Sequence, residues 1–451
     1  MNDLWTEAKR VNADEGKLTL LSRALRRALS PVIGFEDANL VHYRLNRMAK
    51  YHAWSPPAST LSASSQVLTD EQYNYFFGFY DHSPFDEANR RVLVSRTTTS
   101  LEPLNSPKPL ELCYYDLDAE SVEPFGTTKA WNWQQGCRLQ WHPTLPDTAI
   151  YNKHRGNEYL AVCQNVDTGE ITNEFDRPLY EVGPDGIHAL SLNFSRLERL
   201  HPDYGYVGHA DSTEQEAAPS ADGIHLVDLG TGTSELLVSY RTMMEIADAP
   251  PDAHHYAMNL MISPAGDGCS FLHRYHEDGE RVTNLFHVRF DGKDPTILQR
   301  DGEASHPLWI DDDTLFSTVN YLSGIRNRTE YVVYQLNSEP EKRTLDIPLD
   351  VDLHPSLNPR HNDILVADTY PDKYGERTLY LIDMGVPEVI DLGAVYGPVR
   401  NGVKRDLHPR WDNEGNRVCV DLPVHGNRKA LGLLDVSEWM SELTASRHSL
   451  S

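Results

Sequence analysis

Residues 354–369 read HPSLNPRHNDILVADT, and residues 377–393 read RTLYLIDMGVPEVIDLG. A His-Pro turn leads into a β-rich run, and after a loop a second run ends near Asp and Gly. Short runs of β-branched and aromatic residues between turn residues are typical of antiparallel strands. The same order returns in HPRWDNEGNRVCVDLP at residues 408–423, so the pattern belongs to an internal repeat.

Seven such units can be counted along the chain. In order, they begin at Ser83, His142, His188, Ser263, His306, His354 and His408. Repeats of about 50 residues built from short strands are typical of four-stranded blades placed around a central axis. We therefore predict an all-β fold, a seven-bladed β-propeller over residues 70–451. A β-sandwich or a two-domain β protein is the alternative.

Residues 1–69 differ from the repeats and are predicted to form a helical N-terminal extension and a linker. Leu18, Leu21, Leu25 and Leu29 follow helical spacing, and residues 55–69 read as a Pro/Ser-rich linker or an extended edge strand. Residues 1–54 contain nine basic and six acidic residues. The segment is either a helical cap on the propeller or a basic amphipathic element that meets a membrane or a partner.

Composition excludes several classes of partner. The 451 residues include 41 Lys and Arg against 67 Asp and Glu, a net charge of −26, which argues against a nucleic-acid ligand. No apolar run is long enough for a transmembrane helix. The first residues do not read as a secretion signal, and the five cysteines are odd in number and scattered. We therefore expect a cytoplasmic protein.

Histidines recur at matching places in the repeats, at His142, His306, His354 and His408, each followed by Pro. Equivalent positions of successive blades lie at the same radius and height, so these imidazoles can meet at one end of the central channel. The set predicts a divalent metal site, with zinc as the first expectation and manganese or calcium as alternatives. The alternative for each histidine is a role in the turn before its strand.

His255 and His273 flank one predicted strand and are further candidate metal ligands. A lone histidine on a strand more often has a structural role, and this alternative applies to both.

Residues 131–206 concentrate side chains suited to a sugar ligand. Tryptophan faces stack on sugar rings, and Gln and Arg bind hydroxyls and carboxylates. A polar cluster that includes His154 and Arg155 ends a predicted strand. The predicted substrate-binding residues are Trp131, Trp133, Gln134, Arg138, Arg155 and Tyr240. For the tryptophans, packing in the core is the alternative.

Several longer tags carry a family resemblance. They are YNYFFGFYDHSP (73–84), WNWQQGC (131–137), ALSLNFSRL (189–197) with YGY, HPSLNPRHNDILVADTYPD (354–372) and DLHPRWDNEGNRVCVD (406–421). In these tags and in their order along the sequence, the chain resembles β-propeller polysaccharide lyases. The resemblance is closest to ulvan lyases and more distant to oligogalacturonate lyases.

The resemblance implies β-elimination at a uronic acid of an anionic polysaccharide or oligosaccharide, and a structural metal ion. It places Tyr180 as base or acid and Arg196 as the clamp for the carboxylate. Where the family has an active-site histidine, this chain offers Gln134 and Gln135 with His154 nearby, so Gln135 and His154 join the catalytic candidates. A tyrosine base needs a lowered pKa. A non-catalytic glycan- or protein-binding propeller and a glycoside hydrolase are the alternatives.

Overall fold

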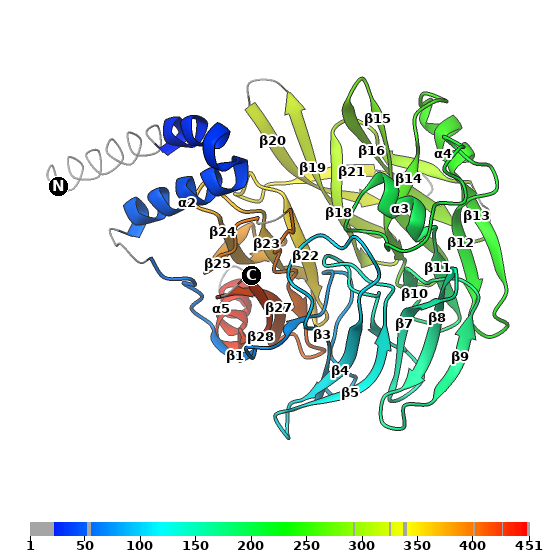
Figure 1. The fold of residues 1–451 in the computed structure, drawn as a ribbon, viewed down its shortest axis with the longest axis horizontal. Coiled ribbons are helices and arrows are strands. Elements are labelled where there is room, and N and C mark those ends of the chain that lie inside the picture. Colours follow the sequence, from blue (N-terminus) through cyan, green and yellow to red (C-terminus); the bar gives the residue numbers. More distant parts are fainter. Residues whose placement is uncertain are drawn as a thin grey trace, which may run out of the picture.

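Seven four-stranded antiparallel sheets are arranged around a central axis as a seven-bladed β-propeller (Figure 1). The computed structural model describes residues 22–51, 56–291, 294–323, 326–336, 341–399, 402–425 and 427–448. The first strands of neighbouring blades contact one another from blade 3 to blade 7, on the side of the central axis. The predicted fold class is therefore confirmed.

Blades 1 to 4 follow one another along the chain. Blade 1 contains β2 (Asn74–Phe76), β3 (Arg91–Thr97), β4 (Leu110–Asp116) and β5 (Ser121–Thr128). Blade 2 contains β6 (Gln140–Trp141), β7 (Thr148–Arg155), β8 (Glu158–Asn165) and β9 (Ile171–Phe175). Blade 3 contains β10 (Glu181–Val182), β11 (His188–Ser191), β12 (Gly223–Asp228) and β13 (Ser234–Ser239). Blade 4 contains β14 (Tyr256–Ile262), β15 (Gly268–Glu277), β16 (Glu280–Arg289) and β17 (Thr296–Gln299).

Blades 5 to 7 complete the ring. Blade 5 contains β18 (Glu303–Asp311), β19 (Thr314–Ser323), β20 (Arg326–Gln335) and β21 (Glu341–Leu345). Blade 6 contains β22 (Leu353–Asn358), β23 (His361–Thr369), β24 (Glu376–Asp383) and β25 (Glu388–Tyr396). Blade 7 contains β26 (Arg410–Trp411), β27 (Arg417–Val424), β28 (Arg428–Asp435) and, from the other end of the chain, β1 (Ser64–Leu68).

Strand β1 closes the ring because it pairs antiparallel with β28, from Ser64 opposite Asp435 to Leu68 opposite Leu431. Of the two alternatives for residues 55–69, the edge strand is therefore observed for Ser64–Leu68. A strand from one terminus that completes a blade of the other terminus leaves no open sheet edge between blades 1 and 7.

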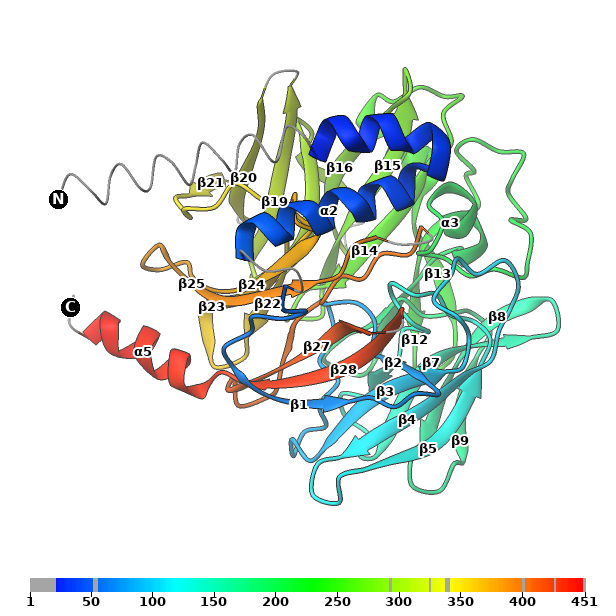
Figure 2. The same cartoon turned by 60° about the vertical axis from the view of Figure 1, so that its left-hand side comes forward.

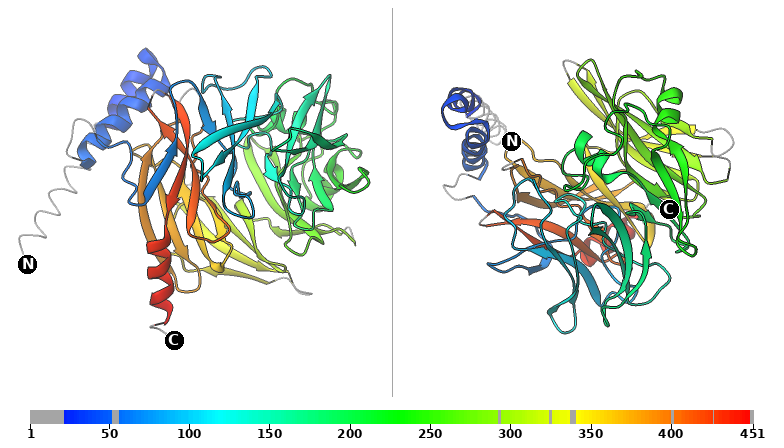
Figure 3. Two further views of the ribbon diagram at one scale, coloured as in Figure 1. Left: turned by 90° about the horizontal axis from the view of Figure 1, so that it is seen from below. Right: turned by 45° about the vertical axis from the view of Figure 1, so that its right-hand side comes forward.

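Helices lie outside the sheets. Residues 22–33 are helical and are followed by α2 (Phe35–Tyr51), which lies beside blade 6 (Figure 2). Helices α3 (Phe194–Leu200) and α4 (Tyr240–Ala247) belong to the connections of blade 3, and α5 (Ser437–His448) points away on the opposite side from the N-terminal helices (Figure 3). Within the part of the chain that the structure describes, no helix combines the length and the apolar character needed to cross a bilayer.

Candidate functional site

Three His-Pro histidines meet at the central channel. His306 lies in β18, His354 lies in β22, and His408 comes two residues before β26. The ring centroids of His306 and His354 are 4.4 Å apart, and those of His354 and His408 are 4.7 Å apart. The geometry expected from matching repeat positions is thus present in blades 5, 6 and 7.

Each of these imidazoles is held through its Nδ1 atom. The Nδ1 atom of His354 lies 3.0 Å from a carboxylate oxygen of Asp368, and that of His408 lies 2.8 Å from the carbonyl oxygen of Gly78. The Nδ1 atom of His306 lies 3.2 Å from Asp352. Such contacts fix the tautomer and leave Nε2 as the free lone pair, the usual arrangement around metal-ligating histidines.

Buried polar atoms at the centre of this group lack partners. Among the described residues, the Nε2 atoms of His354 and His408 and the Oδ2 atom of Asp406 are buried without a hydrogen bond. One ligand atom from each of these three side chains lies within 4.8 Å of the others. Unsatisfied buried nitrogen and oxygen atoms are costly unless something binds them, so the group suits a divalent cation with mixed nitrogen and oxygen ligands.

The charge states of His408 and Asp406 fit the same interpretation. By contrast, burial alone would lower the pKa of His354, but the charge and hydrogen bond of Asp368 and the charges of nearby carboxylates raise it above its ordinary value. Burial lowers the pKa of His408 well below its ordinary value, which keeps its imidazole neutral. Burial by itself would raise the pKa of Asp406, but the charges of Arg377 and the neighbouring histidines hold it below its ordinary value, so the carboxylate is ionised. A metal requires these protonation states of its ligands.

The backbone at two of the histidines is strained. His306 has φ of 48° and His408 has φ of 45°, in the left-handed region that non-glycine residues rarely enter. Proline further disfavours helical conformations at the residue before it. Strain of this kind persists where the surrounding structure enforces it, often at functional sites. By contrast, His142 accepts hydrogen bonds from the backbone of Thr144 and Leu145 and has the turn-forming role given as its alternative.

A cavity of about 230 Å³ lies beside His306. Its lining includes three cations, Arg274, Arg281 and Lys404. Arg281 forms an ion pair with Glu303 at 3.1 Å, but neither Arg274 nor Lys404 forms an ion pair with a described residue. The lining also includes two carboxylates, Glu303 and Asp352, so the three cations leave the cavity with one excess positive charge. In a protein with a net charge of −26, this local excess favours an anionic ligand.

The cavity also contains candidate proton-transfer groups on the segment after α3. Asn193 caps α3 by accepting a hydrogen bond from the backbone N–H of Arg196, and the helix ends at His201. Burial, with Arg274 and Lys404 next in effect, lowers the pKa of His201 to about 2, so its imidazole is neutral. The hydroxyl oxygen of Tyr204 lies 3.3 Å from Nζ of Lys404.

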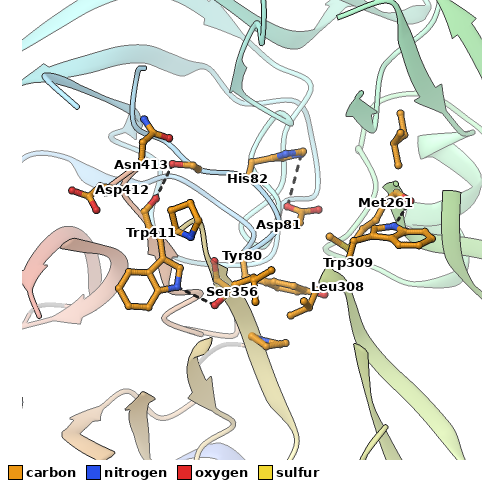
Figure 4. Close-up of a pocket in the computed structure, with 15 residues that line it drawn as sticks. Tyr80, Asp81, His82, Met261, Leu308, Trp309, Ser356, Trp411, Asp412 and Asn413 are labelled. Carbon is orange, nitrogen blue, oxygen red and sulfur yellow. Dashed lines mark hydrogen bonds and ion pairs between the residues drawn. The ribbon is translucent and has the colours of Figure 1, made fainter. Parts of the chain in front are cut away.

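A second cavity, of about 250 Å³, lies further along the same strands (Figure 4). Its walls include Trp309 and Trp411, whose indole N–H groups donate to the carbonyl oxygens of Met261 and Ser356. The ring centroid of Tyr80 lies 5.5 Å from that of His306 and 6.4 Å from that of His408. Tyr80 packs on the imidazoles and also lines this second cavity, so its ring lies between the histidine group and the second cavity.

Trp131 and Trp133 pack in the core rather than on a ligand surface. Both are almost fully buried, their rings lie 4.8 Å apart, and their indole N–H groups donate to the carbonyl oxygens of Lys108 and Glu102. This corrects their assignment as sugar-stacking residues. Gln134 is likewise buried and donates to the carbonyl oxygen of Lys404 at 3.4 Å.

Tyr180 lies in a buried hydrogen-bond cluster. Its hydroxyl oxygen accepts from the side chain of Gln135 at 2.7 Å and from the backbone N–H of Asn259 at 3.0 Å. Burial raises the pKa of Tyr180, which is opposite to the shift that a tyrosine base needs. Arg138 packs on the Tyr180 ring and forms a two-pronged ion pair with Asp81. These contacts do not support catalysis by Tyr180 or Gln135, or substrate binding by Arg138.

Arg196 anchors a loop. All three of its guanidinium nitrogens donate to backbone carbonyl oxygens, those of His255, Thr213, Glu216 and Ala217. Its guanidinium also packs on the buried ring of Tyr240. With its donors engaged and no exposed surface, Arg196 does not fit the predicted carboxylate clamp, and Tyr240 does not fit substrate contact.

The remaining predicted residues lie in other places. His154 stacks on His209 with ring centroids 4.4 Å apart, and the exposed Arg155 pairs with Glu174. His255 and His273 are buried and bonded to each other, with 2.9 Å between Nδ1 and Nε2. Nδ1 of His273 has no hydrogen-bond partner among the described residues, but the pair lies outside the group of His354, His408 and Asp406, whose ligand atoms lie within 4.8 Å of one another.

Five residues of this site are missing from the sequence-based prediction: His201, Arg274, Arg281, Lys404 and Asp406. The motif DLHP does place Asp406 two residues before His408, which is a usable ligand spacing. The others come from loops and strands of different blades, and only the folded ring brings them together.

The fold resembles solved lyase structures. An oligogalacturonate lyase in complex with manganese superposes with a TM-score of 0.58 at 15% identity, covering 84% of this chain and 94% of that one. An oligogalacturonate lyase from Vibrio parahaemolyticus gives a TM-score of 0.54 at 14% identity, covering 84% and 97%. No protein-family model and no curated protein sequence matches the chain. At such identities the likeness shows the β-propeller fold.

Proposed function

We propose that this protein is a lyase that cleaves uronic-acid-containing oligosaccharides by β-elimination. The observation that carries the proposal is the cavity in which the cations Arg274 and Lys404, the neutral His201 and the His306 side of the histidine group face one space. Anion binding beside a neutral base is what removal of a proton next to a carboxylate requires. The similarity in fold to oligogalacturonate lyases supports this class of reaction.

In this mechanism Arg274 and Lys404 bind the uronate carboxylate and make the C5 proton more acidic. The Nε2 or Nδ1 lone pair of His201 accepts that proton. The electron pair of the C5–H bond forms the C4–C5 double bond, and the bond from C4 to the leaving oxygen breaks. The hydroxyl of Tyr204, next to Lys404, is placed to give the leaving oxygen a proton. Burial is the largest cause of the low pKa of His201, and a bound carboxylate counteracts only the smaller contributions of Arg274 and Lys404.

The residues that would hold a divalent ion are His354, His408 and Asp406, and His306 lies next to His354. When bound, the ion would supply positive charge next to the cavity. Manganese is our first choice, because the similar oligogalacturonate lyase was solved with manganese and the ligand set mixes imidazole with carboxylate. Zinc and calcium, which the sequence analysis also named, are the ions to compare with manganese in metal-binding titrations.

The test is incubation of the purified protein and Mn²⁺ with a panel of oligogalacturonate, ulvan oligosaccharides and a neutral glycan. We expect a product with the ultraviolet absorbance of an unsaturated uronate from at least one acidic substrate and none from the neutral glycan. New reducing ends without absorbance would indicate hydrolysis instead. Binding of an acidic glycan without any product would indicate a non-catalytic propeller.

A further inference from the structure

Helix α2 is attached to the edge of blade 6 by a cluster of charges around Glu376. The carboxylate of Glu376 accepts from Arg47 at 2.7 Å, from Lys50 at 2.8 Å and from the hydroxyl of Tyr51 at 3.1 Å. The guanidinium of Arg47 also lies 4.0 Å from the ring centroid of Tyr396. Glu376 and Arg47 are both buried, so their pairing is well shielded from solvent.

The next residue on β24 reaches in the opposite direction, toward the metal ligands. Arg377 is fully buried, and its Nε donates to Oδ1 of Asp406 at 3.0 Å. Its Nη1 donates to the carbonyl oxygen of Gly397. Oδ2 of Asp406, the other oxygen of the same carboxylate, is the unpartnered atom at the centre of the histidine group. Arg377 therefore fixes which way the Asp406 carboxylate faces.

The two sets of contacts share one short piece of sheet. Neighbouring residues of a strand point to opposite faces, so Glu376 and Arg377 necessarily face opposite sides of β24. Glu376 pairs in register with Tyr396 of β25, and Gly397 follows directly. On one face Arg47 contacts Glu376 and Tyr396, and on the other Arg377 contacts Asp406 and Gly397. A shift of this strand end moves both faces together.

We propose that α2 is a positioning element for the metal centre, acting through Glu376 and Arg377 on Asp406. This rests on the divalent-ion site of the proposed function. Without Arg47, the buried Glu376 carboxylate loses its best-shielded partner, and a buried charge without its partner is strongly unfavourable. The end of β24 then relaxes, and Arg377 no longer holds Asp406 in the orientation that ligates the ion.

The experiment is a titration of the metal-stripped full-length protein with Mn²⁺. Electron paramagnetic resonance measures the concentration of free Mn²⁺ at each step. Loss of a residue that orients a metal ligand typically weakens metal binding by about 10- to 100-fold, and we expect Arg377→Gln to fall in that range. For Arg47→Met and Glu376→Gln we expect about tenfold weaker binding, at the lower end of the same range. Thermal unfolding of each stripped variant is recorded to show that the fold is retained.

Arg96→Met is the matched control. Arg96 also pairs with a carboxylate, that of Glu111, and also packs on a tyrosine ring, that of Tyr73, but it lies in blade 1. It should bind Mn²⁺ as the unchanged protein does. If the folded Arg47→Met and Glu376→Gln variants bind Mn²⁺ with unchanged affinity, the positioning role of α2 is refuted while the metal site stands. If the unchanged protein binds no Mn²⁺, the metal site and this inference both fall.

Discussion

Blades 2 and 3 and blades 5 to 7 use similar polar residues in opposite ways. In blades 2 and 3, Tyr180 and Arg196 have their polar atoms bonded to neighbouring groups of the protein. In blades 5 to 7, His354, His408 and Asp406 each leave a buried polar atom without a partner among the described residues.

The contrast shows what to look for in a site of this kind. Density of Trp, Tyr, Gln and Arg in the sequence marks either a ligand surface or a polar core, because both need hydrogen-bonding side chains. Several unsatisfied atoms gathered at one point are the more specific indicator. Single buried atoms without a partner also occur on Gln134, Gln135 and His273, whereas the ligand atoms of His354, His408 and Asp406 lie within 4.8 Å of one another.

The largest expected effect comes from the histidine group. His354→Ala and His408→Ala each remove a ligand, and we expect Mn²⁺ affinity to fall by more than about 100-fold, beyond the range for residues that only orient a ligand. His273→Ala, from the bonded His255–His273 pair in blade 4, should leave the affinity unchanged. Isothermal titration of the stripped proteins measures this. If His273→Ala lost Mn²⁺ binding while His354→Ala kept it, the metal site would lie in blade 4 and not in blades 5 to 7.

The cations and the base come next. Arg274→Gln and Lys404→Gln each remove positive charge from the cavity, and we expect catalytic efficiency to fall by about 10²- to 10³-fold. Loss of a general base typically costs about 10²- to 10⁴-fold, which is our expectation for His201→Gln. Arg155→Gln, an exposed cation of blade 2, is the control and should keep full activity. Product absorbance against an acidic oligosaccharide gives the rates, and full activity in both Arg274→Gln and Lys404→Gln would remove the proposed carboxylate site.

The fold was predictable from the sequence and the site only in part. Turn residues and β-rich runs recur at each blade, so the number of blades and the convergence of His306, His354 and His408 follow from the repeat. The sequence did not reveal the burial of Tyr180 and Arg196, because a motif does not tell which way a side chain points once the chain folds. His201 and Arg274 were missed because they are far apart in the sequence and only the ring brings them into one cavity.

Stability should also fall in acid. The folded-state pKa is about 2 for His201 and about 4 for His255, while an unfolded histidine titrates near 6.5. The unfolded chain therefore binds protons that the folded protein does not, and stability present above pH 6.5 is lost as the pH falls from there toward 4. Each group contributes up to about 1.4 kcal/mol per pH unit. Urea unfolding of the stripped protein at pH 7.5 and 5.0 tests this.

A matched pair of variants isolates the buried histidine. His255→Gln should reduce the loss of stability between pH 7.5 and 5.0, and replacement of the exposed His276 by Gln should not. An equal loss in both variants would assign the acid sensitivity to other groups.

The smallest effect on activity is expected for Tyr180→Phe, and this variant tests most directly whether the active site lies in blades 2 and 3 or in blades 5 to 7. Tyr180→Phe removes a hydroxyl that accepts two hydrogen bonds, leaving the Gln135 amide and the Asn259 N–H buried without an acceptor. An unsatisfied buried donor costs about 1–3 kcal/mol, so we expect the free energy of unfolding to fall by about that amount. Because the ring and its contact with Arg138 remain, the turnover rate should change less than about tenfold, far below the loss of a general base. If turnover instead slowed about a thousandfold with little change in stability, Tyr180 would be the catalytic group and the active site would lie in blades 2 and 3.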